Sequence, residues 1–108
     1  MENVENKVII ITGATSGIGE ATARVLAKHG AKVVLSGRRE ERLEKLANEL
    51  GDSAIYLKSD VTNIEDMKAI VKLTKEKFGK VDVLFANAGI MPAGNMSELD
   101  LKGWMDMV

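Results

Sequence analysis

The chain has 108 residues, of which 45% are hydrophobic and 29% are charged, and this balance suits one globular domain rather than a disordered chain. A formal net charge of −1 argues against a nucleic-acid partner and against binding to an anionic membrane surface. The chain has no cysteine, which excludes disulfides, thiol catalysis and cysteine-bound metal and is compatible with the cytoplasmic location that we expect. Apolar runs of a few residues predict no transmembrane helix, and we expect no metal site.

Short apolar stretches alternate with stretches of helical periodicity along the chain. The apolar stretches predict strands at residues 7–12, 32–36, 54–58 and 81–86. Apolar residues at helical spacing predict helices at about residues 17–29, 40–50 and 62–78, with another beginning near residue 99. Residues 87–97 are rich in Gly and Asn and hold the only Pro, so we expect a loop there.

Cap residues mark several of the element ends. Gly30 is expected to close the first helix, and His29 before it to interact with the negative end of the helix dipole. Thr62 and Glu65 have the spacing of a capping box, so the third helix is expected to start there. Structural roles, at a strand entrance and on a helix face, are expected for Asp82 and Trp104.

The order of these elements predicts the fold class. Strands that alternate with helices through short connections form a parallel sheet with helices on both faces. We therefore predict an α/β, Rossmann-like doubly wound sheet with strand order 3-2-1-4. Ligands of such sheets bind at the carboxyl ends of the strands, where the order reverses. Four loops are expected to meet at that edge, at residues 13–19, 37–39, 60–61 and 87–89.

The glycine-rich stretch at residues 7–19, KVIIITGATSGIG, predicts a phosphate site. A strand that turns tightly into a helix leaves backbone N–H groups and the positive end of the helix dipole at one place. Gly13, Gly17 and Gly19 are expected to serve a tight turn, close approach by a ligand, and helix–strand packing. The alternative is a tight strand–helix connection that holds no ligand.

Arg38 and Arg39 follow the second strand, where a protein that binds a free ribose 2′-hydroxyl would carry an Asp or Glu. Two guanidinium groups at that place favour a 2′-phosphate, through charge-assisted hydrogen bonds. The alternative is that both arginines are solvated turn residues beside Glu40 and Glu41.

Polar residues also follow the third and fourth strands. Asp60 would accept a hydrogen bond from an exocyclic amine or, alternatively, serve as the entry residue of the next helix. Asn87 is expected to tie neighbouring loops together, to bind a ribose, or both. Ala88 and Gly89 would keep the floor of the site flat.

Three segments together resemble the short-chain dehydrogenase/reductase family. Residues 12–19, TGATSGIG, are similar to its T-G-x-x-x-G-x-G motif, and residues 60–61 and 87–89 match its next two signatures in order and spacing. The resemblance covers the chain from about residue 7 to its end, and it implies hydride transfer between an alcohol and a carbonyl with NAD or NADP. The resemblance implies that four residues lie along the pyrophosphate of the cofactor: Gly13, Ser16, Ile18 and Gly19. It places Asp60 and Val61 at the adenine, and Asn87 and Gly89 at the nicotinamide-side ribose.

The resemblance also bears on the choice of cofactor. Arg38 matches the position where NADP-preferring members carry a basic residue, whereas Ser16 stands where many of those members have Lys or Arg. The cofactor expected is therefore NADP in preference to NAD.

The family's catalytic Ser and Tyr-x-x-x-Lys are absent from this chain. The only tyrosine, Tyr56, lies in an expected strand without a Lys four residues on, so we expect it to pack in the core. We therefore expect an inactive fragment: the cofactor-binding half of an oxidoreductase that is a homo-oligomer, with the last strands of the sheet missing. Residues 81–86 would then form a bare apolar edge. The alternative function is a non-catalytic nucleotide-binding or assembly module.

Overall fold

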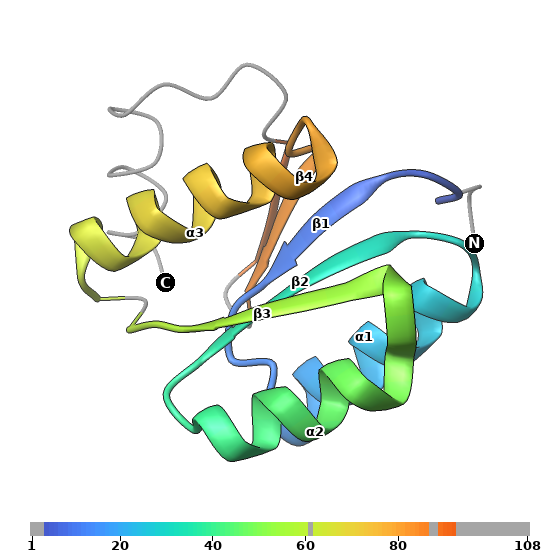
Figure 1. Cartoon of the computed structure of the whole chain (residues 1–108), viewed down its shortest axis with the longest axis horizontal. Coiled ribbons are helices and arrows are strands. Elements are labelled where there is room, and N and C mark those ends of the chain that lie inside the picture. The colour runs from blue at the N-terminus through green and yellow to red at the C-terminus, as the bar shows by residue number, and fades with distance from the viewer. Residues whose placement is uncertain (1–3, 61, 87–88, 93–108) are drawn as a thin grey trace.

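A parallel sheet with helices on both faces forms the centre of the fold (Figure 1). The structure is a computed structural model, and it describes residues 4–60, 62–86 and 89–92. The strands are β1 (Val8–Ile11), β2 (Lys32–Gly37), β3 (Ala54–Lys58), β4 (Val83–Ala86) and β5 (Gly89–Pro92). The helices are α1 (Gly17–Lys28), α2 (Glu40–Leu50), the 3-10 helix η1 (Gly51–Ser53) and α3 (Ile64–Phe78).

The strand order is β3-β2-β1-β4-β5, which confirms the predicted order 3-2-1-4 and the Rossmann-like fold class. β1 is central and pairs in parallel with both β2 and β4, so that Ile10 lies between Val34 and Leu84. β2 pairs in parallel with β3. The order reverses between β1 and β4, as expected for a doubly wound sheet.

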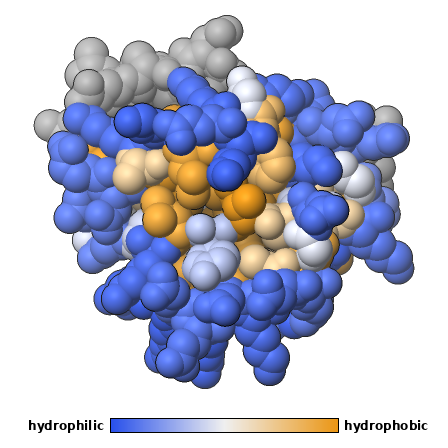
Figure 2. Space-filling model, viewed as in Figure 1, coloured by the Kyte–Doolittle hydropathy of each residue, from blue (hydrophilic) through white to orange (hydrophobic). Residues whose placement is uncertain are grey.

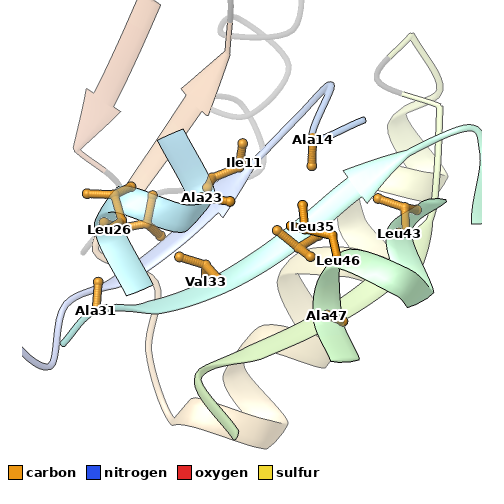
Figure 3. Packing of buried hydrophobic residues seen from close by; sticks show 11 residues of the cluster. Ile11, Ala14, Ala23, Leu26, Ala31, Val33, Leu35, Leu43, Leu46 and Ala47 are labelled. Carbon is orange, nitrogen blue, oxygen red and sulfur yellow. The ribbon is translucent and has the colours of Figure 1, made fainter. Parts of the chain in front are cut away.

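Side chains alternate along each strand and build a separate core on each face. Val8, Ile10 and Leu84 pack beneath α3 with Met67 and Ile70 of that helix. The opposite face is covered by α1 and α2 (Figure 1). Its core, drawn in Figure 3, comprises Ile9, Ile11, Ala14, Ala23, Leu26, Ala31, Val33, Leu35, Leu43, Leu46 and Ala47. Strands that are buried on both faces explain why their sequences read as continuous apolar runs.

The prediction of a loop at residues 87–97 is wrong for residues 89–92, because these residues form β5. β5 pairs with β4 in antiparallel register, with Gly89 opposite Ala86 and Pro92 opposite Val83. The bare apolar edge expected for the fourth strand is therefore also wrong. Unpaired backbone groups at a strand edge favour pairing, and an edge strand tolerates proline on its outer side.

The third helix starts differently from the prediction. Its N-cap is Asn63, whose side-chain oxygen accepts hydrogen bonds from the N–H groups of Glu65 (2.9 Å) and Asp66 (3.2 Å). The predicted capping box at Thr62 is wrong, because the Thr62 hydroxyl donates to Asp60 instead. An Asn two residues before the first free amides satisfies two donors at once.

The fourth strand begins at Val83 rather than at residue 81, and Asp82 explains the difference. Its Oδ2 accepts a hydrogen bond from the N–H of Val8 at 2.8 Å. In a regular pair of strands, a main-chain carbonyl would accept this hydrogen bond. Asp82 thus lies at the strand entrance, as expected.

The other structural expectations concern His29, Tyr56 and the chain after Pro92. His29 is the C-cap of α1, and its Nδ1 lies 2.9 Å from the carbonyl of Val25. Tyr56 is partly buried against the core beneath α2, and its hydroxyl donates a hydrogen bond to Glu44 at 3.5 Å. Burial and the nearby carboxylate raise the pKa of Tyr56. The helix expected from residue 99, with Trp104, lies outside the described residues. In the described part of the chain, no helix has the length and hydropathy to cross a bilayer.

Candidate functional site

A cavity of about 670 Å³ lies at the carboxyl ends of β1, β2 and β3. In Figure 1 these strand ends point to the left of the view. The loops at the ends of these three strands meet there, and the residues that line the cavity are Gly13, Thr15, Ser16, Gly17, Ser36, Gly37, Arg38, Arg39, Arg42, Ser59, Asp60 and Thr62. The site thus lies at the edge of the sheet where ligands of doubly wound folds bind.

Hydrogen bonds between the strand ends hold the floor of this cavity. Ala14 N–H donates to the carbonyl of Ser36 at 3.0 Å, and Ser59 N–H donates to that of Gly37 at 2.8 Å. The buried hydroxyls of Ser36 and Ser59 lie 2.6 Å apart. Ser59 uses its one proton to donate to the carbonyl of Leu57 at 2.9 Å, so Ser36 must be the donor of the pair.

The three glycines of the bend meet different surroundings. Gly13 has φ +64°, a conformation that favours glycine. A Cβ on Gly19 would lie 2.3 Å from the carbonyl oxygen of Gly13, so helix and turn pack against each other at that place. A Cβ on Gly17 would meet nothing within 4 Å. The backbone conformation therefore explains a glycine at residue 13, and close packing explains one at residue 19. Neither reason applies to Gly17, which lines the cavity.

The bend leaves backbone donors at the start of α1. Ser16 caps the helix: its Oγ accepts the N–H of Gly19 at 3.1 Å and donates to the carbonyl of Gly13 at 2.7 Å. The N–H groups of Gly17 and Ile18 make no hydrogen bond with any other described residue. The positive end of the helix dipole lies at the same place. The Ile18 side chain is 67% exposed, which is unusual for a large apolar residue.

Three arginines line the part of the cavity near the carboxyl end of β2. Arg38 and Arg39 lie between β2 and α2, and Arg39 takes the N-cap position of α2 without a side-chain capping bond. Arg42 lies in the first turn of α2. Within the described residues, none of the three guanidinium groups makes a hydrogen bond or ion pair, with Glu40 and Glu41 or with any other side chain. The sequence interpretation did not include Arg42.

Asp60 takes part in the entry to α3. Its Oδ1 accepts hydrogen bonds from the N–H (2.8 Å) and the hydroxyl (2.7 Å) of Thr62, and its own N–H donates to Asp66 at 2.9 Å. The hydrogen bonds from Thr62 and the positive charge of Arg38 hold the pKa of Asp60 below its ordinary value. The helix-entry role is therefore observed. Its Oδ2 makes no hydrogen bond with a described residue, and Asp60 lines the cavity.

The structure brings half of the predicted site residues to the cavity: Gly13, Ser16, Gly17, Arg38, Arg39 and Asp60. Gly19 and Ile18 belong to the first turn of α1 but do not line the cavity. Gly89 begins β5 beside the end of β4, and Val61, Asn87 and Ala88 lie outside the described residues. Sequence reasoning missed Thr15, Ser36, Ser59, Arg42 and Thr62. Of these, only Arg42 carried a signal, because it stands three residues after Arg39 on an expected helix.

A family model described as short chain dehydrogenase matches residues 7–108. The chain belongs to this family. It is 54% identical over 108 residues to the uncharacterized oxidoreductase Lin0452 of Listeria innocua, covering 97% of this chain and 44% of the relative. It is 43% identical over 109 residues to the uncharacterized oxidoreductase SSP1627 of Staphylococcus saprophyticus, again covering 44% of the relative. The chain thus spans less than half the length of these short-chain dehydrogenase relatives.

Solved structures of the family share the same fold. A 3-ketoacyl-(acyl-carrier-protein) reductase from Brucella melitensis, complexed with NADH, superimposes with a TM-score of 0.73 at 46% identity, covering 75% of this chain and 34% of the reductase. A short-chain dehydrogenase/reductase from Burkholderia phymatum, in complex with NAD, superimposes with a TM-score of 0.74 at 38% identity, covering 79% of this chain and 31% of the other. Both comparisons agree with the Rossmann-like assignment of the sheet.

Proposed function

We propose that this chain is the cofactor-binding part of an NAD(P)-dependent oxidoreductase that transfers hydride between an alcohol and a carbonyl. The observation that carries the proposal is the open bend between β1 and α1. Two backbone N–H groups and a helix N-terminus stand free beside a cavity of about 670 Å³, which suits a diphosphate. The Brucella and Burkholderia structures, which hold NADH and NAD, support the same assignment.

Each part of the dinucleotide has residues that would hold it. Gly17 and Ile18 would donate to the pyrophosphate, while Gly13, Ser16 and Gly19 shape the turn. Toward the adenine we assign Asp60 and Val61, and toward the nicotinamide-side ribose Asn87, Ala88 and Gly89. The exposed Ile18 side chain would lose water contact when a nucleotide covers it. The bound cofactor would supply or accept the hydride.

The surroundings of the cavity favour NADP over NAD. Arg38 and Arg39 have no partner among the described side chains, and a 2′-phosphate would give each a charge-assisted, bidentate partner. No Asp or Glu stands at the end of β2 to bind a free 2′-hydroxyl.

We assign no catalytic residue to this chain. Tyr56 lies in β3 against the core, and its hydroxyl donates to Glu44. The parent protein would provide the acid/base tyrosine and its lysine, bind the carbonyl or alcohol substrate, and form a homo-oligomer. We therefore expect the chain of 108 residues to bind nucleotide without turnover. The cytoplasmic location stays a prediction.

The experiment is a titration of the chain with NADPH and with NADH, followed by nicotinamide fluorescence. We expect binding of both, with NADPH tighter. A sample that is folded by circular dichroism and binds neither would overturn the cofactor assignment. A Lys75→Ala variant is the matched control, because it removes one positive charge from the last turn of α3, away from the cavity.

Turnover separates this proposal from the alternative. Reductase activity in a chain of verified mass would contradict the assignment of catalysis to the rest of the parent. A parent whose following residues lack a Ser and a Tyr-x-x-x-Lys would instead support the non-catalytic nucleotide-binding or assembly module.

A further inference from the structure

We propose that Arg42 is a specificity-determining residue that, together with Arg38 and Arg39, binds the 2′-phosphate of the adenine-side ribose, an inference that rests on the proposed NADP preference. Arg42 lies in the first turn of α2 and lines the same cavity as Arg38 and Arg39. Arg39 is the N-cap of α2 and Arg42 the third residue of that helix, so both side chains start from the same end of α2, beside the cavity.

Arg24, whose role is structural, differs from Arg42 in that it forms ion pairs with carboxylates. The Arg24 guanidinium binds Glu20 at 2.7 Å and Glu49 at 2.6 Å and so links α1 to α2. Arg42 stands beside the same small hollow between the two helices, which includes Glu49, yet forms no ion pair with a described residue. Arg42 also lines the larger cavity.

The charges around the cavity match a phosphate dianion. Three arginines line it, and Asp60 is the only acidic residue among its described lining. The three guanidinium groups and the one carboxylate leave a net charge of about +2 among these lining residues. A phosphomonoester carries a charge of about −1.5 to −2 near neutral pH, so it would balance two guanidinium groups.

A ligand pair that differs only in the phosphate tests the inference. Wild-type chain, Arg42→Ala and Lys45→Ala are titrated by calorimetry with adenosine 2′,5′-bisphosphate and with adenosine 5′-monophosphate. Lys45 lies on the same helix and lines the small hollow but not the larger cavity, so its removal controls for net charge. We expect Arg42→Ala to weaken bisphosphate binding by about tenfold and to leave monophosphate binding unchanged. Lys45→Ala should bind both ligands like wild type.

The outcomes separate this inference from the function on which it rests. A wild-type chain that is folded and binds neither ligand overturns the nucleotide site itself. Equal wild-type affinity for both ligands overturns the NADP preference and the role of Arg42 with it. A wild-type preference for the bisphosphate that persists in Arg42→Ala overturns the role of Arg42 alone.

A second variant keeps the test decisive if Arg42→Ala does not fold. Arg42→Lys retains the charge and loses the planar fork of donors. An intermediate loss of bisphosphate affinity, with unchanged monophosphate affinity, supports a direct phosphate contact. Wild-type affinity for both ligands would contradict bidentate binding by Arg42.

Discussion

Gly17 and Gly19 are two positions apart in one bend, yet a Cβ would meet open space at the first and backbone at the second. A methyl group on Gly19 would lie 2.3 Å from the carbonyl oxygen of Gly13, which the turn holds in place. A methyl group on Gly17 would meet no atom within 4 Å, and Gly17 lines the cavity. We therefore expect Gly17 to matter for ligand binding and Gly19 to matter for the fold.

We predict opposite phenotypes for Gly17→Ala and Gly19→Ala. Gly17→Ala should keep or slightly raise stability, because alanine favours the helix, but should weaken NADPH binding. Gly19→Ala should lower the free energy of unfolding by about 1–3 kcal/mol or more, because the backbone must move to admit the methyl group. Urea denaturation and NADPH fluorescence measure the two effects. Normal NADPH binding by Gly17→Ala would contradict the assignment of the bend to a ligand.

Asp82 predicts a specific dependence of stability on pH. Burial opposes its ionisation, but the N–H of Val8 at 2.8 Å and the Lys80 ammonium at 3.0 Å outweigh burial and hold the pKa of Asp82 below its ordinary value. A carboxyl whose folded pKa lies below its unfolded value, about 3.9, stabilises the fold above that pH. The stabilisation is lost as the pH falls further, through the folded pKa.

Asp82→Asn tests this dependence, because it keeps an acceptor for Val8 and removes the charge. The variant should be less stable than wild type at pH 7, and the difference should shrink between pH 4 and pH 2. Urea unfolding across this range measures it. Asp52→Asn, at an exposed aspartate of η1, is the control. A constant difference between Asp82→Asn and wild type at every pH would rule out the charge as the cause.

At the scale of elements, α3 shows how a helix start is chosen between neighbouring residues. Asn63 and Thr62 both suit an N-cap by type. The amide oxygen of Asn63 reaches two free N–H groups of the helix, while the hydroxyl of Thr62 is drawn to the Asp60 carboxylate at the cavity. One residue therefore stabilises the helix and the other shapes the site.

Substitutions at the two positions should separate these roles. Asn63→Ala should lower the free energy of unfolding by about 1 kcal/mol, because two helix N–H groups lose their acceptor. Thr62→Ala should cost less, because Asp60 keeps the hydrogen bond from the backbone N–H of residue 62. Thermal and urea denaturation measure the order. A larger loss for Thr62→Ala would restore the capping box that the sequence predicted.

At the scale of the whole molecule, the edge strands of the described sheet are β3 and β5, so that β4 is not an edge strand. Within the described part of the chain, β3 pairs with β2 alone, whereas β4 pairs with both β1 and β5. Figure 2 shows apolar surface in the centre of the view, where β3 runs between α2 and α3 in Figure 1. A hollow of about 470 Å³ lies there, lined in part by Ile55, Tyr56 and Leu73.

Hydrogen exchange should report this arrangement. Amides of β4 should be protected to the same degree as those of β1, because each strand is paired on both sides. β3 should exchange faster, because its outward N–H groups have no strand partner. Exchange followed by mass spectrometry on the intact chain measures these segments. Rapid exchange in β4, with the amides of β1 protected, would show that β4 is an edge strand, as the sequence alone predicted.

The fold class could be predicted from the sequence because local patterns encode it. Short continuous apolar runs mark the strands and a periodicity of 3.6 residues marks the helices, and short connections with right-handed crossovers leave few possible topologies. The position of the cavity could also be predicted, since the glycine bend and the positions after each strand are local features of the chain. The roles of the cofactor-binding residues, with Val61, Asn87 and Ala88 among them, stay predictions.

Only the tertiary structure decided what depends on partners distant in the sequence. The hydroxyls of Ser36 and Ser59 meet because β2 and β3 end side by side, and Arg42 borders the site because α2 folds back beside it. β5 forms because β1 pairs with only one side of β4, and residues 89–92 pair with the backbone groups of its other side. Such choices are competitions between partners in space, and no short window of sequence contains all the competitors.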